Sequence, residues 1–307
     1  MPSIQSPLGA LPARFRRGRV LIVGCGDVGL RVARLLTPRL RVLALTSQST
    51  RVAPLREAGI VPLIGNLDDV RTLRRLGALA PRVLHLAPPA ALGPRDERTR
   101  RLLGALRLRA APQALVYGST TGVYGDCQGA LVSETRALRP QTDRALRRAD
   151  AQALVLHFGR ATGTSVRVLR IPGIYAADRE GGTPLARLQK AMPVLRQEDD
   201  VFTNHIHADD LARACMVALW RGATQRSFNV SDDSVLKMGD YMDAAAALYG
   251  LPPPPRLGRE ALARELSPMQ MSFMGESRRL DNRRMKQELR LRLRYSDVLT
   301  GLAAGCK

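Results

Sequence analysis

Mostly apolar runs alternate with amphipathic stretches over the first 172 residues of the chain. The apolar runs have the length of buried strands and lie at 20–23, 42–45, 60–64, 83–87, 114–117 and 166–171. The stretches between them place apolar residues at helical spacing and lie at 28–36, 51–58, 68–76, 95–109 and 142–162. Strands that alternate with helices in this way predict an α/β fold with a Rossmann-type, doubly wound parallel sheet. Ligands of such sheets lie beyond the carboxyl ends of the strands.

The pattern becomes less regular after residue 171. We expect a short strand at 204–207, a helix at 211–220 capped by Asp209 or Asp210, a strand at 228–230 and a basic helix near 283–291. These weaker signals predict a small C-terminal substrate lobe. The predicted division is a flexible tail at 1–17, an NAD(P)-binding Rossmann domain at 18–172 and a smaller substrate lobe at 173–307, with 203–221 returning to the Rossmann core.

A glycine-rich turn joins the first predicted strand to the first helix. It reads Gly24-Cys25-Gly26-Asp27-Val28-Gly29, and a second strand follows the helix. In this strand–turn–helix–strand setting the glycines permit a tight turn, the approach of a pyrophosphate and close helix packing. The helix N-terminus attracts an anion. The turn therefore predicts a dinucleotide site.

The end of the second strand indicates which dinucleotide is preferred. Selection of NAD usually requires an acidic residue there, about 20 residues into the motif. Residues 45–51 read LTSQSTR and contain no acid. The hydroxyl groups of Thr46 and Ser47, together with Arg51, suit a 2′-phosphate. We therefore expect NADP(H) to be preferred, with NAD(H) as the alternative.

The net charge of +21 raises the question of a nucleic-acid partner. The excess is almost all arginine spread along the chain, and aromatic residues make up 4% of it, which leaves no platform for base stacking. We favour a solvated arginine-rich surface over nucleic-acid binding. Binding to nucleic acid remains a third hypothesis, and it would make affinity steeply dependent on salt.

Other classes of protein find little support in the sequence. No apolar run reaches the roughly 18 residues of a membrane-spanning helix, and we expect a cytoplasmic protein with no membrane partner. Cys25, Cys127, Cys215 and Cys306 form no Cys-x-x-Cys pair, and the four histidines lack metal-ligand spacing. We expect neither a disulfide framework nor a metal site.

Four segments together resemble the extended short-chain dehydrogenase/reductase superfamily, in its NAD(P)-dependent epimerase/dehydratase group. They are 24–29, the STTGVYG segment at 119–125, LRIPGIY at 169–175 and IHADD at 206–210. The resemblance covers almost the whole chain and is greatest to the atypical YeeZ-type proteins. It implies nucleotide-sugar-like substrates. It also implies adenine contacts by Asn66 and Leu67, cofactor contacts by Ala87, Pro88 and Pro172, and a substrate-phosphate contact by Arg179, which is otherwise an exposed loop charge.

The resemblance fails at the catalytic pair of the superfamily. That pair is Tyr-x-x-x-Lys on the helix after the Val-Tyr-Gly segment, and the matching frame here runs from Arg144 to Arg148. A guanidinium stays protonated, so Arg144 cannot replace the tyrosine as acid and base. Arg148 keeps the positive charge of the lysine and with it a ribose contact. Alternatively, both arginines bind an anion or form a solvated helix face.

Three other side chains are candidates for catalysis. Thr120 matches the superfamily's Ser/Thr that bonds a substrate oxygen, Tyr124 lies near it in sequence, and His207 titrates near neutral pH. The alternatives are a strand-end cap for Thr120 and a structural, hydrogen-bonded histidine before a helix cap for His207. We expect an oxidoreductase or epimerase with an atypical site that acts on a small polar substrate, either phosphorylated or not. The alternative is a non-catalytic NADP(H)-binding sensor. The sequence does not specify an oligomeric state.

Overall fold

The computed structural model describes residues 18–267, 270–271 and 274–305, and its centre is a parallel sheet. Its strands are β1 (Arg19–Val23), β2 (Arg41–Thr46), β3 (Val61–Ile64), β4 (Arg82–His85), β5 (Ala114–Thr120), β7 (Ser165–Ile171) and β12 (Arg226–Asn229). Their order is β12-β7-β5-β4-β1-β2-β3, and every pairing is parallel. The predicted Rossmann-type sheet is confirmed. The strand order reverses between β1 and β4, which is where such sheets bind ligands.

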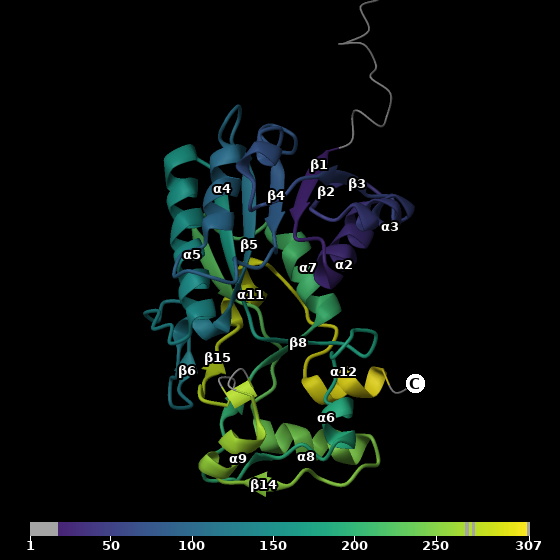
Figure 1. Cartoon of the computed structure of the whole chain (residues 1–307), viewed down its shortest axis with the longest axis vertical. Coiled ribbons are helices and arrows are strands. Elements are labelled where there is room, and N and C mark those ends of the chain that lie inside the picture. The colour runs from purple at the N-terminus through teal and green to yellow at the C-terminus, as the bar shows by residue number, and fades with distance from the viewer. Residues whose placement is uncertain (1–17, 268–269, 272–273, 306–307) are drawn as a thin grey trace, which may run out of the picture.

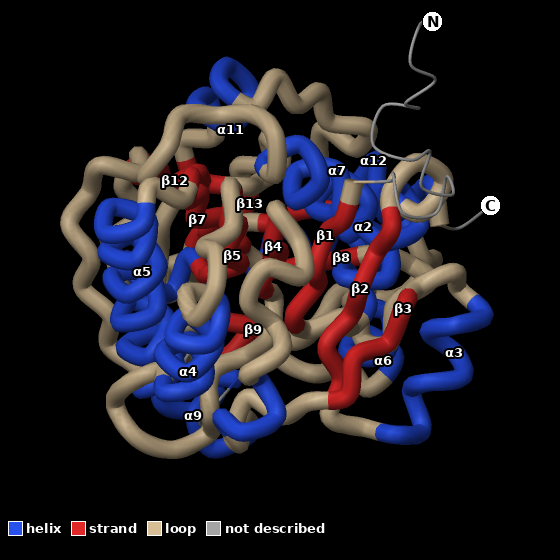
Figure 2. The backbone as a smooth tube through the Cα atoms, turned by 90° about the horizontal axis from the view of Figure 1, so that it is seen from above, coloured by secondary structure: helices blue, strands red, loops and turns tan. Residues whose placement is uncertain are grey.

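Helices cover both faces of the sheet (Figure 2). Helices α4 (Glu97–Leu106) and α5 (Asp143–Thr162) pack on one face, and α2 (Asp27–Leu36) and α7 (Ala208–Ala218) pack on the other. Alternation along β1 explains the two layers, because successive side chains of a strand point to opposite faces. Val20 and Ile22 join the α2–α7 core, whereas Leu21 and Val23 join the α4–α5 core.

Shorter helices complete this part of the chain. Helix α3 (Val52–Glu57) follows η1 (Ser49–Arg51), and η2 (Val70–Leu73) and η3 (Thr121–Tyr124) are single 3₁₀ turns. The long helix α5 begins after Thr142, whose side chain accepts a hydrogen bond from the Ala145 N–H, and it ends at Gly163, whose φ is 73°. These are the usual caps of a helix.

The remaining elements form a small lobe beyond the carboxyl ends of the strands (Figure 1). Its helices are α6 (Leu185–Gln189), α8 (Met238–Leu248), α9 (Arg259–Glu265) and α12 (Val298–Ala304), while α11 (Arg283–Glu288) packs beside β12. Its strands form two-stranded pairs, namely β8 (Gly173–Tyr175) with β11 (His205–His207), β9 (Val194–Leu195) with β14 (Arg256–Leu257), β10 (Phe202–Thr203) with β13 (Leu236–Lys237), and β6 (Leu131–Val132) with β15 (Arg279–Leu280).

Two sequence predictions need correction, and one lies outside the structure. Helix α7 starts at Ala208, and its cap is His207 rather than Asp209 or Asp210. The helix expected up to residue 76 is reduced to η2, although Asp69 caps it as predicted. The tail predicted at 1–17 lies outside the described residues. Within the described part of the chain, no helix combines the length and apolar character needed to cross a membrane.

Candidate active site

A cavity of about 790 Å³ opens where the strand order reverses. The sheet contributes residues at the carboxyl ends of four strands, including Gly24 after β1, Leu86 after β4 and Gly118 in β5. The small lobe contributes the opposite wall, with Arg187 on α6 and Tyr241 on α8. The cavity therefore lies between the sheet and the lobe, at the place expected for a ligand of this fold.

The glycine-rich turn has the shape of an open cradle. Gly24 has a φ of +90°, and a Cβ there would lie 2.2 Å from the Ala87 backbone nitrogen. Gly26 caps α2, has no side-chain capping bond, and a Cβ there would meet no atom within 4 Å. The turn thus needs glycine at position 24 for its own packing, and it leaves space at position 26 beside the free N–H groups of α2. This arrangement fits a diphosphate.

The other residues of the turn differ in exposure and charge. Cys25 is buried, and burial raises the pKa of its thiol to about 11, so that its size matters more than its reactivity. Val28 lines the cavity. Asp27 also lines it and is paired with Arg31 at 3.1 Å and with Arg179 at 3.5 Å. The negative charge of Asp27 in the anion cradle is therefore balanced by two arginines.

Arg179, for which the resemblance implied a substrate-phosphate contact, lies beside the glycine-rich turn. Its ion pair with Asp27 places it beside the cofactor turn, although it also lines the cavity. Arg31 additionally pairs with Asp178 and Asp209, each at 2.6 Å. This cluster connects α2, the loop after β8 and the start of α7.

The segment that follows β2 contacts the glycine-rich turn through the side chain of Arg51. Arg51 Nη2 donates to the Cys25 carbonyl oxygen at 2.7 Å. Thr46 Oγ1 bonds the backbone of Gln48, and Ser47 is exposed. These residues lie outside the cavity wall within the described part of the chain, and Arg51 brings positive charge to the turn.

The residues expected to border the adenine and ribose surround the same edge of the sheet. Asn66 Oδ1 accepts from the Asp68 N–H, and the Leu67 carbonyl oxygen accepts from Arg101. The Ala87 N–H donates to the Val23 carbonyl oxygen at 3.0 Å, next to Gly24. The Pro88 oxygen accepts from Arg98 at 3.5 Å. None of these four residues belongs to the cavity wall as the described residues define it.

Helix α5 presents two arginines to the cavity. Arg144 and Arg148 both line it, as expected for two residues one turn apart. Arg148 Nη1 donates to the Gly118 carbonyl oxygen at 2.8 Å and to the Tyr117 hydroxyl at 3.1 Å. The sequence of α5 contains neither tyrosine nor lysine. The cation at position 148 is thus fixed against the end of β5.

Two candidate catalytic residues near the end of β5, Thr120 and Tyr124, lie in different surroundings. Thr120 lines the cavity, and its Oγ1 accepts from the Gly122 N–H at 3.3 Å. It therefore has the strand-end capping bond, and its bond to a substrate oxygen stays a prediction. Tyr124 is 1% exposed and is not part of the cavity wall within the described chain. Its hydroxyl donates to Asn229 Oδ1 and accepts from Arg170 Nη1, each at 2.7 Å. Burial raises the pKa of Tyr124. This placement does not fit the catalytic role expected for it.

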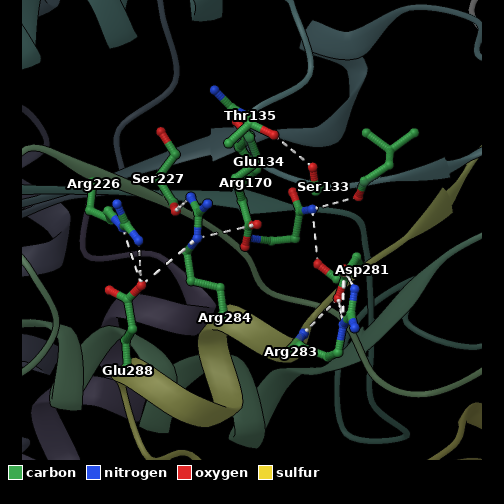
Figure 3. Close-up of polar contacts among 12 residues, drawn as sticks. Ser133, Glu134, Thr135, Arg170, Arg226, Ser227, Asp281, Arg283, Arg284 and Glu288 are labelled. Carbon is green, nitrogen blue, oxygen red and sulfur yellow. Dashed lines mark hydrogen bonds and ion pairs between the residues drawn. The ribbon is translucent and has the colours of Figure 1, made fainter.

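Arg170 extends the contacts of Tyr124 toward the C-terminal segment. Figure 3 shows Arg170 beside Glu134, whose backbone oxygen accepts from Arg170 Nη1 at 2.9 Å. The Glu134 carboxylate in turn lies 3.5 Å from Arg284 on α11 (Figure 3). The buried tyrosine therefore belongs to a polar network that joins the sheet to α11.

His207 occupies the position that the structural interpretation assigned to it. Its Nδ1 accepts from the Asp209 N–H at 3.2 Å, and its ring lies 3.9 Å from the ring of Tyr295. It is 6% exposed and, among the described residues, it does not line the cavity. The histidine that does is His205, whose pKa burial lowers to about 4. The two histidines are two residues apart on β11 and so lie on the same side of the strand, where both rings contact the ring of Tyr175. Strand alternation in the sequence therefore could not have distinguished them.

The cavity wall is rich in positive charge. Its charged residues within the described chain are Arg144, Arg148, Arg179, Arg187, Arg278, Asp27 and Glu276. Arg187 and Arg278, together with Tyr241, were missed at the sequence level, because they come from the lobe with weak periodicity. Pro172, for which the resemblance implied a cofactor contact, lines the cavity. Within the described residues, no group of three or more metal-ligating side chains comes together. Cys25, Cys127 and Cys215 are free, and Cys306 lies outside the described residues.

Comparisons with known proteins agree with this architecture. Protein YeeZ of Escherichia coli (strain K12) is 28% identical over 251 residues, which are 77% of this chain and 85% of YeeZ. A functionally unknown conserved protein from Silicibacter pomeroyi DSS has a TM-score of 0.79 at 28% identity, covering 94% of this chain and 98% of its own. UDP-glucuronic acid 4-epimerase from Bacillus cereus, in complex with NAD, has a TM-score of 0.72 at 16% identity, covering 93% and 96%. This last likeness shows the fold.

A family model supplies the assignment. The description of the model is "NAD dependent epimerase/dehydratase family", and it matches residues 20–231. This range runs from β1 to just past β12, so it includes the glycine-rich turn, the end of β5 and the part of the cavity wall that precedes residue 232. The resemblance based on the four sequence segments is confirmed. The chain belongs to the NAD dependent epimerase/dehydratase family.

Proposed function

We propose that the chain binds NADP(H) at the glycine-rich turn and acts as an oxidoreductase or epimerase on a small polar, sugar-nucleotide-like substrate. The observation that carries this proposal is the arginine-lined cavity of about 790 Å³ that begins at the Gly24–Gly29 turn and ends in the small lobe. A cavity of this size, closed by a second lobe, suits a cofactor and a substrate placed end to end. The family is NAD dependent, and relatives of the same fold are named for sugar-nucleotide substrates.

The charge near the end of β2 supports NADP(H) over NAD(H). Thr46, Ser47 and Arg51 stand where an acidic residue would bind the ribose hydroxyls of NAD. Arg51 is held beside the turn by its bond to the Cys25 oxygen, which leaves the rest of its guanidinium for a 2′-phosphate. A bound nicotinamide would supply hydride transfer.

The proposed site works without a Tyr-x-x-x-Lys pair. Arg148, fixed against Gly118, takes the position of the lysine and contributes a permanent positive charge beside the ribose. Thr120 lines the cavity, and its hydroxyl can bond a substrate oxygen. Neither group exchanges a proton readily at neutral pH, so proton transfer in this proposal relies on the substrate's own groups or on water.

The test is calorimetric titration of the full chain with NADPH and NADH, with Gly26→Arg beside it. A Cβ at position 26 would meet no atom within 4 Å, so we expect the fold to persist while the arginine side chain occupies the space above the turn and excludes the diphosphate. Gly104→Arg is the matched control, because Gly104 is an exposed glycine of α4 whose Cβ would also meet no atom within 4 Å. We expect NADPH to bind the wild type and the control and not Gly26→Arg. Absence of NADPH binding to the wild type would refute the proposal.

A non-catalytic NADP(H) sensor is the second candidate. It is favoured by the burial of Tyr124, the capping role of His207 and the lack of tyrosine and lysine on α5. Nicotinamide absorbance, followed while NADPH-loaded or NADP⁺-loaded chain is mixed with a series of nucleotide sugars, separates the two. A steady change in absorbance supports an oxidoreductase. Epimerisation returns the hydride to the sugar and leaves the absorbance unchanged, so conversion of the nucleotide sugar to its epimer, followed by chromatography, supports an epimerase. Tight binding of NADPH without any turnover supports the sensor.

A further inference from the structure

The small-lobe wall of the cavity combines one arginine with two rings. Arg187 belongs to α6, which packs against α8 in the lower lobe of Figure 1. Tyr241 belongs to α8, and His205 belongs to β11. All three line the cavity. They belong to the lobe, whereas the glycine-rich turn belongs to the sheet.

The guanidinium of Arg187 has no compensating charge. Within the described residues, no hydrogen bond or ion pair reaches it, and its Nε is buried without a partner. Three other arginines of the cavity differ in this respect. Arg148 bonds Gly118, Arg179 pairs with Asp27, and Arg278 pairs with Glu276 at 2.7 Å. Burial lowers the pKa of Arg187, although a guanidinium stays charged. A partly buried charge without a partner costs free energy, which an entering anion offsets.

The surface around Arg187 offers no acid of its own. The acids that line the cavity within the described chain are Asp27 and Glu276, and arginines occupy both. Burial raises the pKa of Tyr241 and lowers that of His205 to about 4, so both rings are neutral near pH 7. Their centroids lie 4.5 Å apart with the planes tilted by 39°. Arg187 therefore stands beside a neutral aromatic surface.

We propose that Arg187 binds an anionic oxygen group of the substrate, either a carboxylate or a phosphate, with the adjoining part of the substrate against Tyr241 and His205. The planar fork of a guanidinium bonds two oxygens of such a group at once. The inference rests on the proposed function of the cavity, and it specifies that the substrate is acidic at the end that enters the small lobe.

The experiment uses the full chain saturated with NADP⁺, so that the glycine-rich turn is already filled. Pyrophosphate and malonate are titrated separately by calorimetry into the wild type, Arg187→Gln, Arg187→Lys and Lys190→Gln. Lys190 is the matched control, because it directly follows the same helix, is exposed and lies outside the cavity wall. The probe that binds more tightly identifies phosphate or carboxylate as the group.

We expect at least one probe to bind the wild type and to lose affinity by about tenfold or more in Arg187→Gln, with a smaller loss in Arg187→Lys. Lys190→Gln should stay within about twofold of the wild type. Binding of neither probe to the loaded wild type overturns the inference, and so does equal binding by Arg187→Gln.

Two controls distinguish a failure of this inference from a failure of the proposed cofactor binding. NADP⁺ should bind Arg187→Gln and the wild type equally, which tests the proposed function by itself. If NADP⁺ binds neither, the proposed function fails, and the same titrations on the unloaded chain decide whether the anion site exists. In anion-free buffer, Arg187→Gln should melt no lower than the wild type, because it removes an uncompensated charge. A clearly lower melting temperature would assign Arg187 a structural role and overturn the inference.

Discussion

At the scale of single residues, two glycines of one turn have opposite purposes. Gly24 is required by the fold, because its φ of +90° and the nearby Ala87 nitrogen leave no room for a side chain. Gly26 is not constrained in this way, because a Cβ there would meet no atom within 4 Å. We therefore expect substitution at position 24 to reduce stability and substitution at position 26 to reduce binding of the proposed cofactor.

Arg51 gives a prediction about cofactor choice. Arg51→Ala should weaken NADPH binding by about tenfold, or about 1.4 kcal/mol, and leave NADH binding nearly unchanged, because the 2′-phosphate is the group that differs. Calorimetric titration of both nucleotides measures this. Arg56→Ala, which removes an exposed arginine of α3, is the charge-matched control. If both nucleotides lose affinity equally, Arg51 acts by holding the turn through the Cys25 oxygen.

At the scale of elements, a group of buried polar side chains connects the carboxyl ends of neighbouring strands through hydrogen bonds. Arg170 on β7 contacts Tyr124 after β5, Gln152 on α5 and the backbone of Glu134. Gln152 also donates to Ser119 Oγ at 2.5 Å. Buried polar groups of this kind are costly unless each finds a partner, and here they fix the strand ends that border the cavity.

Tyr124 provides the test at this scale. Tyr124→Phe leaves Asn229 Oδ1 without the hydroxyl, and we expect a loss of about 1–3 kcal/mol in the free energy of unfolding. Urea unfolding measures it, with Tyr295→Phe as control. Tyr295 loses the same atom from a less buried residue, and the structure shows no hydroxyl bond for it within the described chain. Unchanged stability together with abolished turnover would instead support the catalytic role expected from the sequence.

At the scale of the whole molecule, the chain passes from the sheet to the small lobe and back, so the two parts are connected at more than one place. Helix α7 and strand β12 come after the first lobe segment, yet they complete one face and one edge of the sheet. Asn282, near the C-terminus, donates to the backbone oxygens of Ser231 and Asp232 directly after β12. The two parts of the chain are therefore held together by several buried contacts.

Asp232 lies at one of these contacts and makes the stability of the fold depend on pH. Burial raises its pKa from 3.8 to about 7, and its Oδ2 has no hydrogen-bond partner within the described residues. The folded chain thus holds a proton that the unfolded chain releases. This contribution to stability is full below pH 3.8 and is lost as the pH rises through about 7.

Asp232→Asn should remove this dependence, because the amide is neutral at every pH and its Oδ1 can still accept from the Ser234 N–H. We expect the variant to be more stable than the wild type, with an advantage that is larger near pH 8 than near pH 5 by about 1–3 kcal/mol. Urea unfolding at both values measures the difference. A difference of the same size at both would show that Asp232 does not hold the proton.

The sequence by itself determined the sheet and the cofactor turn, because both depend on local patterns. The apolar runs predicted six strands of the sheet to within a few residues, with β12 also anticipated, and Thr142 was the predicted start of α5. Gly24 to Gly29 needed no tertiary information, since strand, turn and helix are consecutive in the chain.

The tertiary structure alone decided which polar side chains face the cavity. Tyr124 and His207 carry suitable groups near the right strand ends, but one points into a polar network and the other caps α7. Arg187, His205 and Tyr241 are far apart in sequence and meet only when α6, β11 and α8 pack together. Local periodicity specifies which face of an element is apolar. It does not specify which distant elements supply the opposite wall of a cavity, because that depends on long-range packing.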